Sequence, residues 1–117
     1  MVTRGPDFEA TITFLTTEEG GRSTPVYSGY RPNQHLGLSN ILSDAVHYYD
    51  TDEAIYPGQT VKAQLTLFYP FPYHGALSEG LQFTVQEGSR IVGRGMITKI
   101  CNPQFQSRPG DPRPAES

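Results

Sequence analysis

The sequence predicts an all-β domain, because hydrophobic and polar residues alternate in several short runs that are separated by turn residues. Twelve Gly and ten Pro among 117 residues supply those turns, and seven Tyr and six Phe suit the pleated surface of a sheet. A chain of this length corresponds to one domain. Since no segment predicts a repeat or a helix of ordinary length, we expect a barrel or a sandwich.

The first predicted strand follows a polar N-terminal lead, residues 1–7. Residues 8–16 alternate, with apolar side chains on one face at Phe8, Ala10, Ile12 and Phe14. Residues 18–21, EEGG, form a turn in which glycine adopts the positive φ of a tight reversal, and residues 24–31 leave it as a second extended run. We therefore expect a hairpin between these two runs.

The middle of the chain is less regular. Residues 33–56 fit neither the helical nor the strand period, so we expect short strands joined by loops. A Pro-Gly turn at 57–58 precedes a clear strand in the segment 59–69, QTVKAQLTLFY. Pro70 and Pro72 end that strand, because proline donates no hydrogen bond to a sheet.

The last predicted element is a hairpin that folds over Gly88 and Ser89, with residues 81–86 leading in and residues 91–100 returning. Gly93 and Gly95 lie inside the returning strand, and we expect them to permit a bend or bulge. The domain accordingly spans residues 8–100. Residues 101–117 contain four prolines and one large apolar residue, which predicts a Pro-rich flexible tail.

Charge and cysteine content restrict the function. A net charge of −3 with two lysines argues against a general nucleic-acid-binding surface, and we interpret Arg90, Arg94 and Lys99 as an ordinary solvated face. Cys101 is the single cysteine, so the sequence permits no intramolecular disulfide and no Cys-based zinc site, and we expect a cytoplasmic location. No segment has the run of apolar residues that a membrane helix needs.

Catalytic and metal sites are not predicted. His35, His47 and His74 lie near acidic residues in the sequence, but their spacing matches no zinc motif. We interpret these segments as solvated loops rather than as a metal site. No serine or cysteine has the setting of a nucleophile. We expect no enzyme activity, no cofactor and no bound metal.

An aromatic segment, YPFPYH at 69–74, offers a candidate partner surface. Tyr69, Phe71 and Tyr73 are the candidate contacts for a protein partner. The alternative interpretation is that the same rings are buried at one end of the barrel.

Several blocks of the sequence, in order, resemble the C-terminal (third) domain of elongation factor Tu over residues 8–100. The blocks are FEA at 8–10, EEGGR at 18–22, TP at 24–25, GYRP at 29–32, PG at 57–58, VK at 61–62, TL at 66–67, Pro70, GL at 80–81, Phe83, EG at 87–88, Arg90, VG at 92–93, Gly95 and Lys99. The resemblance implies a six-stranded antiparallel closed β-barrel without enzyme activity. It also implies that nucleotide binding is absent, since no GTPase domain accompanies the barrel.

In the parent factor this domain packs on the GTPase domain and the second barrel, contacts the T-stem of aminoacyl-tRNA and helps to bind the exchange factor. The resemblance therefore makes Glu87, Gly88, Arg90 and Asn33 candidate RNA contacts. Asn33 replaces the usual Gln and Tyr69 a basic residue, while residues 36–48 bring the acidic Asp44 into the region. Because a carboxylate repels phosphate, tRNA binding is expected to be weak or absent.

These observations favour a non-enzymatic interaction module, with a translation-related protein as its partner and with oligomer formation left open. The alternative is an accessory protein that binds tRNA or another RNA through the turn at 87–90. A metal-dependent or hydrolytic enzyme that uses the histidines ranks last.

Overall fold

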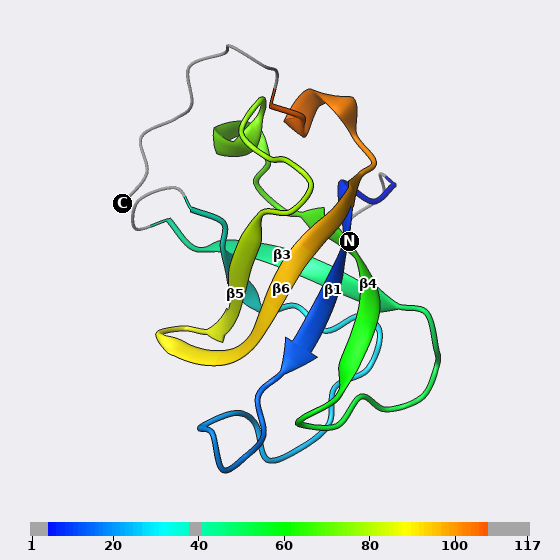
Figure 1. Cartoon of the computed structure of the whole chain (residues 1–117), viewed down its shortest axis with the longest axis vertical. Coiled ribbons are helices and arrows are strands. Elements are labelled where there is room, and N and C mark those ends of the chain that lie inside the picture. Colours follow the sequence, from blue (N-terminus) through cyan, green and yellow to red (C-terminus); the bar gives the residue numbers. More distant parts are fainter. Residues whose placement is uncertain (1–4, 38–40, 108–117) are drawn as a thin grey trace.

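The computed structural model describes residues 5–37 and 41–107. Its elements, in chain order, are β1 (Phe8–Phe14), β2 (Asn33–His35), β3 (Ser43–Tyr49), β4 (Thr60–Leu67), the 3-10 helix η1 (Phe71–Tyr73), β5 (Gln82–Glu87), β6 (Arg90–Ile100) and the 3-10 helix η2 (Pro103–Phe105). The strands form a closed barrel in the order β1-β4-β3-β2-β5-β6, and all neighbours are antiparallel. The six-stranded closed barrel is thus confirmed (Figure 1).

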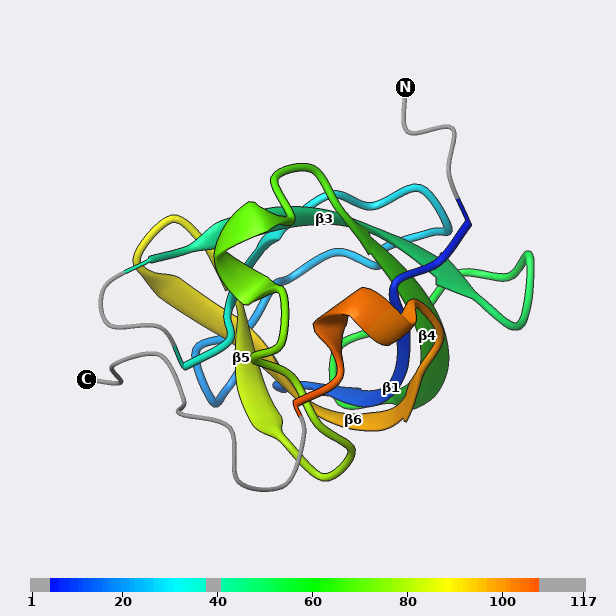
Figure 2. The same ribbon diagram turned by 90° about the horizontal axis from the view of Figure 1, so that it is seen from above.

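The two ends of the barrel are built differently. Figure 1 shows η1 and η2 at one end and the β5–β6 turn at the other. Seen from above in Figure 2, the two short helices lie over the mouth of the barrel. Since closure pairs both edges of every strand, exposed loops and helices at the ends are the natural places for a binding site.

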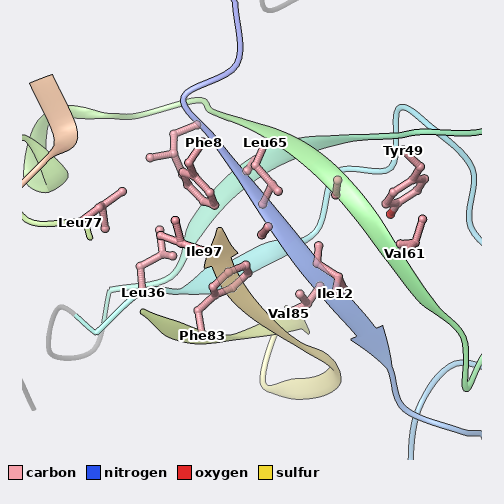
Figure 3. Close-up of a cluster of buried hydrophobic side chains, with 14 of the residues drawn as sticks. Phe8, Ile12, Leu36, Tyr49, Val61, Leu65, Leu77, Phe83, Val85 and Ile97 are labelled. Atoms are coloured by element: carbon pink, nitrogen blue, oxygen red, sulfur yellow. The ribbon is translucent and has the colours of Figure 1, made fainter. Parts of the chain in front are cut away.

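The alternating side chains of the strands fill the barrel. Phe8, Ile12, Leu65, Val85 and Ile97 are at most 1% exposed and converge on the interior (Figure 3). Burying side chains of this kind stabilises the fold by about 1.5–3 kcal/mol each. The period-two pattern that predicted β1, β4 and β5 from the sequence is therefore the pattern of the core.

Strand β6 carries two bulges, although not at its glycines. Val85 pairs with Gly93 and Gln86 with Ile91, which leaves an extra residue at Val92, and a similar irregularity in the β1–β6 register falls at Thr98. The two glycines provide space instead. A Cβ on Gly95 would lie 2.3 Å from Cζ of Phe83, whose ring covers the β6 backbone.

The expected hairpin between residues 8–16 and 24–31 is wrong. Strand β1 pairs with β4 on one side and β6 on the other, so neither of its edges is available to the second run. Residues 17–20 do form a turn, but the chain then crosses the barrel end and makes an isolated antiparallel bridge between Val26 and Ile55. A local turn signal thus predicted the reversal correctly and the pairing incorrectly.

The predicted domain boundaries are too narrow at both ends. Asp7 is fully buried, and its carboxylate accepts a hydrogen bond from the Leu67 backbone N–H at 2.8 Å. At the other end, Phe105 is fully buried, and its backbone carbonyl accepts a hydrogen bond from the Leu77 N–H at 2.8 Å. Residues 101–107 therefore belong to the fold and are no flexible tail, while the remainder of the predicted tail, 108–117, lies outside the described residues.

Replacing Gly95 by Ala should destabilise the barrel by about 2–3 kcal/mol, because the added methyl group displaces the Phe83 ring from a packed core. Urea unfolding of Gly95→Ala measures the effect. Gly5→Ala is the control, since a Cβ at Gly5 meets nothing within 4 Å, and its change should stay within about 0.5 kcal/mol. Equal stability of the two variants would contradict the close contact between Phe83 and β6.

Candidate functional site

The four candidate RNA contacts lie together at the end of the barrel that carries the β5–β6 turn, and we call Asn33, Glu87, Gly88 and Arg90 the turn cluster. Asn33 begins β2, which pairs with β5, and the other three residues belong to the β5–β6 hairpin. The backbone N–H of Gly88 donates a 3.0 Å hydrogen bond to Oδ1 of Asn33. The sequence-based grouping is therefore also a spatial grouping.

The polar groups of the turn cluster are directed at the protein itself. Asn33 donates its amide Nδ2 to Asp44, and Arg90 donates to the backbone carbonyls of Gly20 and Gly21. The Gly88 N–H, which an RNA phosphate would need, is already bonded to Asn33. These contacts tie the β5–β6 turn to the neighbouring loop and to β2.

Glu87 joins the same end through two residues that sequence analysis did not single out, Arg22 and Tyr30. Arg22 forms an ion pair with Glu87, and the Tyr30 hydroxyl donates to Glu87 Oε2 at 2.5 Å. Partial burial acts to raise the pKa of Glu87, but the hydrogen bonds from Tyr30 and Arg22 and the charges of Arg22 and Arg90 outweigh it, so that the pKa is lowered. Both residues lie in the EEGGR and GYRP blocks, yet only the fold reveals their partner.

A second candidate surface lies at the opposite end. Tyr69 and Phe71 are 62% and 67% exposed, and their rings meet edge to face with centroids 5.7 Å apart. His74 packs against Phe71 at 5.7 Å and against the buried Phe105 at 5.2 Å. We call Tyr69, Phe71 and His74 the aromatic ledge.

Tyr73 does not belong to this exposed surface, and its assignment as a partner contact is wrong. The ring is fully buried, and its hydroxyl forms a hydrogen bond with Ser43 Oγ at the start of β3. The 3-10 turn of η1 has about three residues per turn, so Phe71 and His74 face outward while Tyr73 faces the core. The sequence left open that these rings are buried at one end of the barrel, and for Tyr73 this alternative holds.

Among the described residues, the histidine that lies in the interior is His47 on β3. It is fully buried, with Nε2 bonded to Gln34 Oε1 at 2.5 Å and Nδ1 bonded to the Tyr49 hydroxyl at 3.1 Å. Because an amide oxygen only accepts, Nε2 carries the proton and Nδ1 accepts from Tyr49. Burial lowers the pKa of His47 to about 3, so the ring is neutral and serves as a structural connector.

The histidines do not form a metal centre. Both ring nitrogens of His47 are occupied inside the barrel, His74 lies on the aromatic ledge and His35 lies on β2. Over residues 5–37 and 41–107, no group of three or more His, Cys, Asp or Glu side chains is placed to hold a metal ion. Within the same ranges no helix has the length and apolar character required to cross a bilayer.

A broad groove of about 550 Å³ runs along the outer faces of β1, β5 and β6. Its polar lining includes Thr11, Thr13, Thr84, His35 and Arg94. The hydroxyl of Thr84 donates to Gln86 on the same strand at 2.7 Å. The groove presents polar side chains but no converging set of catalytic groups.

These features define the class of the protein: a closed antiparallel β-barrel domain with a bonded turn cluster at one end and an exposed aromatic ledge at the other. The sequence matches the family model described as the elongation factor Tu C-terminal domain over residues 1–101. The chain belongs to this family. It is a family of translation-factor domains, and the domain itself is a non-catalytic β-barrel.

The buried His47 predicts a pH-dependent stability. The ordinary pKa of histidine is 6.5, so below this pH the unfolded chain takes up a proton at His47. In the folded chain the pKa of His47 is about 3, so the ring stays neutral down to about pH 3. The free energy of unfolding should therefore fall as the pH falls through this window, by about 2 kcal/mol between pH 7 and pH 5. Urea unfolding across that range measures the slope.

His47→Gln should flatten this slope, because the group that titrates in the unfolded chain is removed. His74→Gln is the matched control and should retain the slope, since His74 is exposed. An unchanged slope in His47→Gln would show that His47 is not the group responsible.

Proposed function

We propose that this barrel is a non-enzymatic interaction module that binds a translation-related protein partner through the aromatic ledge. The observation that carries the proposal is that Tyr69 and Phe71 are the two most exposed aromatic side chains of the described residues and pack directly against each other. Large aromatic side chains are enriched at the energetic centres of protein interfaces, where they provide area at a low cost in entropy. We further propose a cytoplasmic location and no requirement for nucleotide or cofactor.

The ledge is supported by a rigid platform, which favours binding. Pro70 and Pro72 flank Phe71 and restrict the backbone, and the buried Tyr73 anchors η1 to β3 through Ser43. A surface that is held in position before binding loses less conformational freedom when a partner arrives. The geometry therefore supports a preorganised contact rather than a loop that must fold on binding.

The lack of catalysis is supported by the surroundings of the most reactive side-chain type. Burial raises the pKa of the Cys101 thiol, the charges of Glu9 and Asp7 raise it further, and the charge of Lys99 opposes them. A thiol with a raised pKa is a poor nucleophile at neutral pH. His47 is likewise unsuited to acid–base chemistry because it is enclosed by Gln34 and Tyr49.

RNA binding through the turn cluster is the alternative, and the contacts argue against it as the main function. The Gly88 N–H and the Arg90 guanidinium are bonded within the protein, and Asp44 adds a negative charge beside Asn33. RNA would have to break these hydrogen bonds to gain phosphate contacts. We therefore assign the turn cluster a structural role.

A gel-shift series with unmodified tRNA tests this assignment. We expect no retarded band even at low salt, where phosphate contacts are strongest. Arg90→Ala should lower the stability of the protein, because it removes the hydrogen bonds to Gly20 and Gly21. Binding that strengthens as salt decreases and disappears in Arg90→Ala would favour the RNA alternative.

Affinity capture from native lysate tests the partner surface. The unmodified chain should recover one or more specific proteins, and Tyr69→Ala and Phe71→Ala should each weaken that recovery by about tenfold or more, the typical effect of removing an interface aromatic. Tyr48→Ala is the matched control, because Tyr48 is 50% exposed on β3 and lies outside the ledge. Equal recovery by all three variants would exclude the ledge as the contact.

A further inference from the structure

The groove on the outer faces of β1, β5 and β6 has a local charge opposite to that of the whole chain. Arg94 and His35 line it, and none of the described lining residues carries a carboxylate. The chain as a whole has a net charge of −3. The groove volume of about 550 Å³ lies in the range of ligand-binding sites. Electrostatic complementarity therefore favours an anionic ligand.

Arg94 lies between two hydroxyl side chains on the outer face of the sheet. It pairs with Thr13 on β1 and with Thr84 on β5. Side chains that are directly opposite on neighbouring strands have Cβ atoms about 5 Å apart. The Thr13 hydroxyl forms a hydrogen bond with Thr60 at 2.9 Å. The Thr84 hydroxyl donates to Gln86 at 2.7 Å, so both flanking side chains are held in place while the exposed guanidinium between them supplies the charge.

The acidic side chain whose charge interacts with Arg94 is Glu19, and its oxygens are directed elsewhere. The Glu19 carboxylate accepts from the Thr16 backbone N–H at 2.8 Å and from the Thr16 hydroxyl at 3.0 Å. These hydrogen bonds lower the pKa of Glu19, desolvation opposes them, and the charge of Arg94 adds to them. Among the described residues no acceptor is bonded to Arg94, in contrast to Arg22 and Arg90.

Strand β6 places an apolar side chain next to Arg94 along the groove. Met96 is two residues further on the same face and is 42% exposed, with Thr11 and Gln82 opposite it. Residues i and i+2 of a strand lie about 7 Å apart. An extended peptide that runs along the groove has the same spacing between alternate side chains. An acidic and an apolar residue two positions apart would therefore reach Arg94 and Met96 together, and the flexible Met side chain adapts to different apolar partners.

We propose that this groove binds an extended acidic peptide segment of a protein partner. A Glu or Asp side chain of the peptide contacts Arg94, and an apolar side chain two positions away contacts Met96. The groove is separate from the aromatic ledge, so the proposal does not depend on the function assigned to the ledge. RNA fits less well, because it needs several cations along its backbone and aromatic rings for base stacking, whereas the described lining supplies a single arginine.

Nuclear magnetic resonance of the full chain with the synthetic peptide acetyl-Glu-Ala-Leu-Ala-Glu-amide tests the proposal. We expect saturable shifts of the backbone amide resonances around Thr13, Thr84 and Arg94, and a dissociation constant that rises with salt. Arg94→Gln should raise the dissociation constant about fivefold, the effect of losing an exposed charge pair of good geometry. Lys99→Gln is the matched control, because it removes the same charge from β6 at a position outside the groove lining, and it should leave the affinity unchanged.

Four results would overturn the proposal. The first is the absence of saturable shifts at millimolar peptide. The second is equal affinity for a peptide in which Gln replaces both Glu residues, since the charge would then contribute nothing. The third is equal weakening by Arg94→Gln and Lys99→Gln, which would indicate a general attraction between charges. The fourth is a short polyuridine RNA that shifts the same amide resonances when the peptide does not, which would assign this face to nucleic acid.

A further variant separates this groove from the aromatic ledge. Phe71→Ala should leave peptide binding unchanged, because Phe71 does not line the groove. Loss of affinity capture in Phe71→Ala and loss of peptide binding in Arg94→Gln therefore report on two different surfaces. Weaker peptide binding in Phe71→Ala would contradict the placement of the peptide in the groove.

Discussion

The fold depends on closing the barrel at its shortest strand, β2. Only two backbone residue pairs join β2 to β3, and the buried side chain of Gln34 reinforces this seam. Its amide donates to the Ser43 carbonyl at 2.8 Å and its oxygen accepts from His47. Buried hydrogen bonds of this kind are costly to break, because each broken bond leaves a desolvated polar group without a partner. No buried side-chain nitrogen or oxygen in the described ranges lacks such a partner.

Closure determines where the protein can act. The wall of the barrel has no free strand edge, so a partner has to bind at an end or on the outer surface. At one end Glu87, Arg22 and Arg90 connect the loops to each other. The polar groups that an RNA ligand would need are therefore already bonded within the protein. At the other end η1 and η2 cover the core with Tyr73 and Phe105 and leave Phe71 exposed. The contrast between a bonded end and an open apolar end underlies the assignment of function.

Sequence patterns predicted the elements whose signal is local. Alternation predicted β1, β4, β5 and β6, since each has one face in the core. It did not predict the neighbours of β1, because pairing with β4 and β6 depends on contacts across 47 or more residues that no turn signal encodes. Within the candidate sites, the aromatic composition of residues 69–74 could not separate Tyr73 from Tyr69 and Phe71, because the burial of Tyr73 follows from the three-residue period of η1. It also gave no indication that Glu87 pairs with Arg22, because that ion pair exists only in the folded barrel.

The central claim is that β2 closes the sheet by pairing on both of its edges. Backbone nuclear Overhauser contacts between assigned strands test it most directly. The account predicts contacts from Gln34 to Val85 on β5 and, at the same time, from Gln34 to Ser43 on β3. Contacts on only one side, with rapid amide exchange along the other, would mean an open sheet and would contradict the account.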